Sequence, residues 1–425
     1  MPGRHSHAGG RPIARWAIAC LCCSPALAQD AASTQRDAAP PLPHVIAGDE
    51  EGDCFGATVA DVGDVDGDGC RDFAVGAVNH LGRSTRYVRV FSGADRAPLL
   101  TLRDARAGTA LFGSSIAAAG DVDGDGHGDV IVGSPRFLLG RGNAQVFSGA
   151  DGRRLWKLEA EGGGSSFGWS VCSPGDLDDD GRPDLAVSSY QSFETGIVVV
   201  YSGATGEEID RIESLHGGAV LANAGDLDGD GRDDLLVGCP SRSVEEMFQG
   251  ETLLFSGATR KELRRWPGPR IHTSMGSVVA GVGDLDDDGV GDLLICAKGL
   301  DRKGNNAGGA FVVSGADGNV MYRLDSPKAG TEFGTRCSRL DDLDGDGVSE
   351  FAVLTQRSGS APYVPGRAYV YSGKSGDLLD SYEGQAIASL PPHGDRDEPL
   401  LILGRPSAGQ PLPAGQVGSV IVLRR

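Results

Sequence analysis

"DVDGDGCRDFAVG", from Asp64 to Gly76, places aspartates at positions one, three, five and nine of a glycine-containing loop and follows them with an apolar run. The pattern returns five more times along the chain at spacings of 50 to 58 residues. The further copies are "DVDGDGHGD" at Asp121, "DLDDDGRPD" at Asp176, "DLDGDGRDD" at Asp226, "DLDDDGVGD" at Asp284 and "DLDGDGVSE" at Asp342. Internal repetition at this period predicts a propeller, a solenoid or an array of repeats.

Three other features keep phase with each acidic loop. Nine residues before its first aspartate stands a Phe-Gly pair or a replacement: Phe55-Gly56, Phe112-Gly113, Phe167-Gly168 and Phe333-Gly334, with Gly217-Gly218 and Met275-Gly276 in the fourth and fifth copies. A short apolar run follows the loop, then a second run that ends in a Ser-Gly turn, then a final strand-like piece. These β-branched and aromatic runs show no helical period. Each copy is predicted to form four short antiparallel strands, with the acidic loop as the first hairpin turn.

The number of copies decides the architecture. A seventh, decayed copy begins near Ala386, with Gly394-Asp395 in phase, but the chain stops before its fourth strand. An unmatched strand stands at the other end, where Ile46 precedes Phe55 by nine residues. We therefore predict an all-β, seven-bladed β-propeller over residues 44–425, closed by an N-terminal strand at 45–48 that leaves no open edge. The blades are expected to begin near residues 55, 112, 167, 217, 275, 333 and 386. An open array is the alternative, but it would need polar capping repeats at its ends.

The acidic loops begin like the calcium-binding loop of an EF-hand, although the twelfth position holds Val75 where an EF-hand has glutamate. Calcium takes six to eight oxygen ligands, and alternate residues of a tight loop can turn inward on one ion. In the first copy Asp64, Asp66, Asp68, the carbonyl of Cys70 and Asp72 are the expected ligands. The other sets are Asp121, Asp123, Asp125 and Asp129; Asp176, Asp178, Asp180 and Asp184; Asp226, Asp228, Asp230 and Asp234; Asp284, Asp286, Asp288 and Asp292; and Asp342, Asp344, Asp346 and Glu350.

Asp-Gly dipeptides also make ordinary turns, which explains the glycines of these loops. It does not explain four acids in each of six loops, which repel one another without a cation. The sequence thus predicts up to six Ca²⁺ ions. The sixth loop is the weakest of these sites because Glu350 replaces aspartate, and "HGDRDEPLL" in the seventh copy is too short for an ion.

The N-terminus has the layout of a secretory signal peptide. Arg4, Arg11 and Arg15 precede an apolar run, and small residues lead to a cleavage site near Ala28/Gln29. An uncleaved anchor is disfavoured because the run is too short to span a bilayer, and lipidation at Cys20 is a second alternative. We expect residues 1–28 to be removed, 29–43 to be a flexible linker, and the protein to be secreted, periplasmic or at the cell surface.

The net charge of the chain limits the kinds of partner it can bind, and the spacing of its cysteines bears on zinc sites and disulfides. Without Arg4, Arg11 and Arg15, 36 of the 39 basic residues face 59 acidic ones, so the mature chain carries a net charge of −23. Such a surface repels nucleic acid and anionic membranes. The six mature cysteines show no CxxC pair, so neither a zinc site nor a disulfide framework is predicted. A bond between Cys54 and Cys70 stays open, with buried free thiols as the favoured interpretation.

From about residue 44 onward the units resemble FG-GAP repeats, the blades of the N-terminal propeller of integrin α chains. The resemblance rests on Phe-Gly, the D-x-D-x-D-G-x-x-D loop and the Gly-Ala/Ser/Cys-Pro box in fixed order. It implies a ligand face opposite the acidic loops, made by the loops between second and third strands and by the links between blades. Candidate contacts there are Arg136, Phe137, Tyr190, Phe193 and Tyr363.

No catalytic constellation is visible, because the histidines are scattered and pair with no recurring Ser, Cys or Glu. We therefore expect an exported, calcium-binding, non-enzymatic protein-interaction or adhesion-type module, monomeric, with an extracellular or periplasmic protein or glycan as ligand. The alternative is a carbohydrate-directed propeller, either a lectin or a polysaccharide lyase. A lectin would be favoured by equivalent aromatic residues in the blade grooves, and the sequence does not show them.

Overall fold

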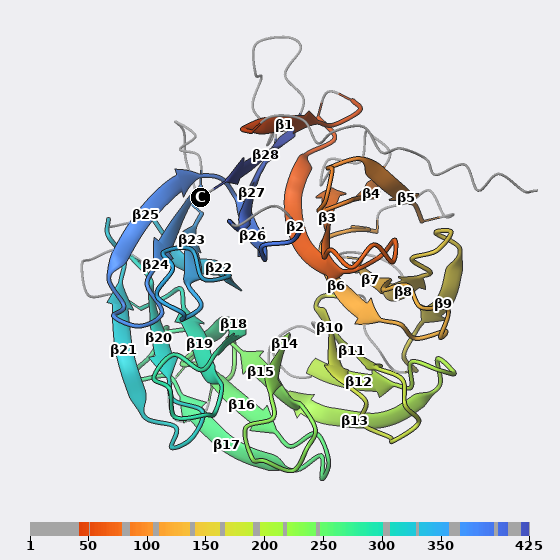
Figure 1. Ribbon diagram of the computed structural model, residues 1–425. Helices are drawn as coiled ribbons and strands as arrows, with labels where there is room; N and C mark the ends of the chain where they lie inside the picture. Colours follow the sequence, from red (N-terminus) through yellow and green to blue (C-terminus); the bar gives the residue numbers. More distant parts are fainter. Residues whose placement is uncertain are drawn as a thin grey trace, which may run out of the picture. The chain divides into compact units, whose positions relative to one another are not determined.

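Twenty-eight strands form seven four-stranded sheets in this computed structural model, and every sheet is antiparallel. The structure describes residues 42–50, 52–78, 86–104, 110–136, 141–161, 166–189, 196–215, 219–243, 247–300, 307–328, 331–356, 366–394, 398–406 and 418–424. All of them belong to the unit Ala38–Arg425. The sheets are arranged around a common axis as a propeller, with one strand of each sheet on the inner side (Figure 1).

We number the sheets as blades along the chain. Blade 1 contains β2 (Phe55–Gly63), β3 (Asp72–Ala77), β4 (Tyr87–Phe91) and β5 (Pro98–Leu102). Blade 2 contains β6 (Ile116–Gly120), β7 (Asp129–Ser134), β8 (Asn143–Phe147) and β9 (Arg154–Leu158). Blade 3 contains β10 (Val171–Gly175), β11 (Asp184–Ser189), β12 (Gly196–Tyr201) and β13 (Glu208–Leu215). Blade 4 contains β14 (Val220–Gly225), β15 (Asp234–Cys239), β16 (Glu251–Phe255) and β17 (Glu262–Pro267).

Blade 5 contains β18 (Met275–Gly283), β19 (Asp292–Ala297), β20 (Gly309–Val313) and β21 (Val320–Asp325). Blade 6 contains β22 (Phe333–Arg339), β23 (Phe351–Thr355), β24 (Arg367–Tyr371) and β25 (Leu378–Glu383). Blade 7 contains β26 (Ala386–Leu390), β27 (Leu400–Arg405), β28 (Ser419–Arg424) and β1 (His44–Ala47). The predicted fold class and the count of seven blades are confirmed.

The N-terminal strand closes the ring as predicted. β1 pairs antiparallel with β28, with Val45 opposite Ile421 and Ala47 opposite Ser419. The N–H of Gly48 continues the ladder by donating to the carbonyl of Gly418 (N···O 2.9 Å). Blade 7 therefore takes its outer strand from the opposite end of the chain, and this pairing covers the edge of β28.

The first strands β2, β18, β22 and β26 begin at the expected residues 55, 275, 333 and 386. In blades 2 and 3 the first strand begins four residues later, at Ile116 and Val171, because the Phe-Gly pair forms a turn before it. The fourth start, at residue 217, lies outside the described residues.

In the blades that have it, the Phe-Gly pair packs the blade onto the one before it. Phe112 is buried among Val88 and Val90 of blade 1 and Val130 of blade 2. At the closing junction, a Cβ on Gly404 of blade 7 would lie 2.2 Å from the carbonyl oxygen of Gly56, which is shorter than any van der Waals contact. The two backbones can approach this closely only because both residues are glycine. The fixed order of motifs in the sequence thus reflects contacts between successive blades.

The hydrophobic core lies between blades and along their second strands. β3, β7, β11, β15 and β19 are buried at every position, whereas the fourth strands β9 and β17 consist mostly of exposed and half-buried residues. None of the six cysteines between residues 54 and 337, all of them described, forms a disulfide, and this includes Cys54 and Cys70. Four of them are buried.

The expected signal peptide and nearly all of the expected linker lie outside the described residues. Within the described part of the chain, no helix is long and apolar enough to cross a membrane.

The antiparallel order gives each blade two distinct ends. The acidic turn between first and second strands lies at the same end as the turn between third and fourth strands, and we call this end the acidic-loop face. The connections between second and third strands, and the links to the next blade, lie at the other end, which we call the opposite face.

Candidate metal centres

The six acidic loops are the first hairpin turns of blades 1 to 6, as predicted, and the first aspartate of each holds the turn together. In blade 1, Asp64 accepts hydrogen bonds from the N–H groups of Gly67, Asp68 and Gly69 (2.8, 3.1 and 2.8 Å). The two glycines have φ of 75° and 83°, in the left-handed region. Asp121, Asp176, Asp226, Asp284 and Asp342 accept from their own loops in the same way.

The carboxylates of each loop converge, but the described geometry does not bring all four together everywhere. In blade 1 an oxygen of each of Asp64, Asp66 and Asp72 lies within 4.8 Å of the others. Asp121, Asp123 and Asp129, and Asp176, Asp178 and Asp184, form equivalent groups, whereas in blade 4 the group is Asp226, Asp228 and Asp230. The aspartates at position five also brace the turn, as Asp68 does by accepting from the N–H of Cys70 (2.8 Å). Asp125, Asp180, Asp288 and Asp346 accept from the loop in the same way.

The acid at position nine has a structural role that the sequence did not reveal. Asp72 is fully buried, and its two oxygens accept from the N–H of Val65 in its own loop and from the N–H of Gly93 in the turn between β4 and β5 (both 2.8 Å). It therefore joins the two turns at the acidic-loop face of its blade. Asp129, Asp184, Asp234 and Asp292 make the same pair of bonds in blades 2 to 5.

The turn must come very close to the loop for this contact. A Cβ on Gly93 would lie 1.9 Å from the carbonyl oxygen of Arg71, so only glycine fits. The Ser-Gly turn that recurs in phase with the acidic loop was the sequence signal for this contact.

We expect Asp72→Asn to lower the free energy of unfolding by roughly 2 kcal/mol, because the amide nitrogen would face an N–H donor and leave a buried group unpaired. Chemical denaturation in EDTA measures this without any contribution from metal. The matched control is Asp95→Asn, whose side chain accepts from the N–H of Ala97 at an exposed turn and should change the stability little. A loss seen only with calcium would instead identify Asp72 purely as a metal ligand.

The sixth loop differs from the others because its acid at position nine is Glu350, whose side chain is longer than that of aspartate. Glu350 accepts from the N–H of Leu343 with Oε2, while its Oε1 is buried and accepts no hydrogen bond from the described residues. Asp342, Asp344, Asp346 and Glu350 all offer an oxygen within 4.8 Å of one another. The sixth loop, which the sequence ranked last, thus has its four acids together and one buried oxygen without a donor. This donor set fits a hard divalent cation.

Burial and crowding oppose ionisation of the position-nine acids. Burial raises the pKa of Asp72 to about 7, although the N–H groups of Gly93 and Val65 lower it, and Asp66 and Asp68 raise it further. For the same reasons the pKa of Asp129, Asp184, Asp234 and Asp292 rises to about 6. Burial likewise raises the pKa of Glu350 to about 7. A bound divalent cation would offset the repulsion between these carboxylates.

Side chains at loop position seven connect neighbouring acidic loops. The Nδ1 of His127 lies 3.0 Å from the carbonyl oxygen of Val65 in the preceding blade. Arg182 and Arg232 reach the carbonyls of Asp121 and Leu177 in the same manner. These contacts therefore join the acidic loop of each of blades 2, 3 and 4 to the acidic loop of the blade before it.

The predicted contacts of the opposite face are mostly outside what the structure describes. Phe137, Tyr190, Phe193 and Tyr363 are among the residues that are not described. Arg136 is described and half-buried, and its carbonyl accepts a long hydrogen bond from the Ser166 hydroxyl (3.5 Å).

Comparison with known families settles the nature of the repeat. Residues 112–147, which span most of blade 2, match the FG-GAP repeat model. The chain carries FG-GAP repeats. Residues 176–237, from the acidic loop of blade 3 into blade 4, match the related FG-GAP-like repeat model.

The FG-GAP blades are similar to those of integrin α chains. Integrin alpha-IIb of Homo sapiens is 36% identical over 175 residues, which cover 36% of this chain and 16% of the integrin. Integrin alpha-V of Gallus gallus is 30% identical over 260 residues, which cover 58% of this chain and 20% of the integrin. The chain therefore matches a fifth or less of the length of these relatives. Among solved structures, BBS1N in complex with ARL6DN superposes with a TM-score of 0.53 at 9% identity over 89% of this chain and 94% of that one, a likeness of fold alone.

Proposed function

We propose that this FG-GAP propeller is an exported, calcium-stabilised, non-enzymatic interaction module that binds a protein ligand with its opposite face. The observation that carries the proposal is the combination of seven FG-GAP blades with sequence similarity to integrin α chains across more than half of this chain. The resemblance to integrin α propellers implies a ligand face away from the acidic loops. The acidic loops then stabilise the ring and leave the other end free for binding.

An apolar patch on the opposite face supports this orientation. Met247, in the connection between β15 and β16, is 57% exposed, and Ile271, in the link from blade 4 to blade 5, is 47% exposed. Two contacts join these segments. The N–H of His272 donates to the carbonyl of Met247 (N···O 3.0 Å), and the rings of His272 and Phe248 stack with their centroids 5.7 Å apart. Exposed apolar side chains held in a fixed arrangement are typical of protein interaction sites.

Affinity capture with the mature chain as bait tests the proposal. In millimolar calcium we expect an exported protein to be captured, and we expect the double variant Met247→Ser/Ile271→Ser to weaken its binding about tenfold or more, as loss of an apolar contact at a binding hot spot would. The matched control is Val320→Ser/Leu378→Ser, which removes equally exposed apolar residues at the start of the outer strands β21 and β25, on the acidic-loop face.

Parallel capture on glycans separates the alternatives. Equal loss of protein binding in both double variants would show that the ligand does not use the opposite face. Selective capture of a polysaccharide, with no protein bound, would replace the proposal by a carbohydrate-directed propeller.

A further inference from the structure

Arg336 places an isolated positive charge at the centre of the opposite face. It lies on β22, the inner strand of blade 6, opposite Leu354 and toward the end of that strand away from its acidic loop. No ion pair or hydrogen bond from the described residues reaches its guanidinium, although the chain as a whole carries a net charge of −20. Most other arginines of the described blades pair with an acid or a carbonyl, as Arg153 does with Asp123.

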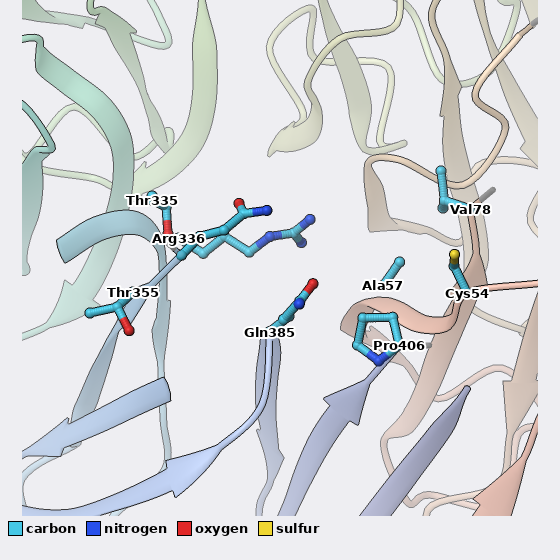
Figure 2. A pocket seen from close by; sticks show the side chains of 9 residues that line it. Cys54, Ala57, Val78, Thr335, Arg336, Thr355, Gln385 and Pro406 are labelled. Carbon is cyan, nitrogen blue, oxygen red and sulfur yellow. The ribbon is translucent and has the colours of Figure 1, made fainter. Parts of the chain in front are cut away.

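Two cavities meet at this side chain. One of about 140 Å³ is lined by residues of blades 6, 7 and 1, and a second of about 200 Å³ extends toward blades 2 and 3. Ala57, Val78 and Arg336 line both of them. In Figure 2 the side chain of Arg336 extends from blade 6 into the space between the blades, facing Ala57 and Val78, and Gln385 points into the same space.

The surroundings suit an anion. Among the residues that the structure describes, no aspartate or glutamate lines either cavity, and the polar lining near Arg336 includes the neutral side chains of Thr355, Gln356 and Gln385. The blades crowd closely enough around the guanidinium that desolvation lowers the pKa of Arg336, so a bound anion would restore interactions that the charge has lost. Arg336 as a whole residue is nevertheless exposed, and its side chain lines both cavities, so a ligand can approach it from there.

We propose that Arg336 binds a single carboxylate of the ligand protein, from an aspartate or glutamate side chain or a C-terminus, at the entrance of the central channel. A guanidinium offers two parallel N–H donors that match a carboxylate. Each cavity is smaller than the roughly 300–1,000 Å³ of a site that encloses a drug-sized ligand, so each accommodates a side chain rather than a whole oligomer. One cation suits one carboxylate better than a doubly charged phosphate. This inference rests on the proposed function, because it names the chemical group that the opposite face recognises.

Nuclear magnetic resonance of the arginine side chains tests the site directly. The Nε–H signal that disappears in Arg336→Gln assigns Arg336, and the folded chain is then titrated in calcium with N-acetyl-aspartyl amide and with its neutral counterpart N-acetyl-asparaginyl amide. We expect the Arg336 signal to shift saturably with the aspartyl probe and at least about tenfold more weakly with the asparaginyl probe, since a charge-assisted pair is lost. Arg339, on the same strand but at its other end, should shift with neither.

Equal response to the two probes, or none to either, would overturn the proposal. Tighter saturation by galacturonate than by the aspartyl probe would assign the site to an acidic sugar instead of a protein.

A second arm separates this proposal from the function on which it rests. Capture of the protein ligand should fall about tenfold in Arg336→Gln and remain unchanged in Arg339→Gln, with equal melting temperatures showing that both variants fold. If capture is unchanged in Arg336→Gln, the carboxylate site is wrong while the interaction module stands. If the aspartyl probe saturates Arg336 but no protein is captured, the module is wrong while the anion site stands.

Discussion

Chelation of calcium is expected to lower the melting temperature of this protein by on the order of 10 °C. If each acidic loop binds with a Kd near ~0.1 mM, millimolar calcium stabilises the fold by roughly 1.4 kcal/mol per site. Over six loops this amounts to about 8 kcal/mol, comparable with the whole stability of a typical domain. The net charge agrees with this expectation, because six divalent ions would reduce the −20 of the full sequence to −8.

Thermal unfolding with and without EDTA measures this effect, and restored calcium should restore the original melting temperature. Asp226→Asn should remove about one sixth of the stabilisation, since it disables only the loop of blade 4. Identical melting curves in calcium and in EDTA would show that the acidic loops hold together without an ion.

Removal of the closing strand is expected to have an effect of similar size. A chain that begins at Asp49 lacks β1 and leaves the backbone groups of β28 unpaired at an exposed edge. The loss of its backbone hydrogen bonds and of the apolar contact of Ile46 with the core of blades 7 and 1 should cost several kcal/mol in total. We expect a lower melting temperature and self-association through the open edge.

The two faces of β1 provide the control. Ile46 is half-buried against the core that includes Phe55 and Val420, whereas Val45 is 57% exposed. Ile46→Ala should therefore destabilise by about 1–3 kcal/mol and Val45→Ala by less than about 0.5 kcal/mol. A chain that begins at Asp49 but melts like one that begins at Leu42 would contradict the closure of the ring by β1.

Much of the fold could be predicted because each blade repeats the same local pattern. Phe55, the acidic loop and the Ser-Gly turn keep a constant phase, so the strands between them follow from alternation and turn chemistry. The closing strand could be predicted as well, since Ile46 stands in the phase of a fourth strand without three strands before it. The starts of β6 and β10 were predicted four residues too early, because Phe112-Gly113 and Phe167-Gly168 form a turn whereas Phe55-Gly56 begins a strand.

The candidate centres were predictable in residue type but not in the detail of their bonding. Sequence spacing placed Asp72 next to its own loop, but it could not show that the N–H of Gly93 reaches the same carboxylate. That contact depends on how the third and fourth strands return to the loop, 19 to 23 residues later in the chain. Arg336 had no sequence signal, because its cavities are assembled from blades that are far apart in sequence.

The number of calcium ions bound per chain tests the central claim most directly. The protein is first stripped of metal with chelator and then dialysed against several millimolar calcium in the presence of magnesium. Its calcium content per chain is then measured by elemental mass spectrometry. The account predicts six calcium ions per chain, and five in Asp226→Asn. A folded protein that retains no calcium above the dialysis buffer would contradict it.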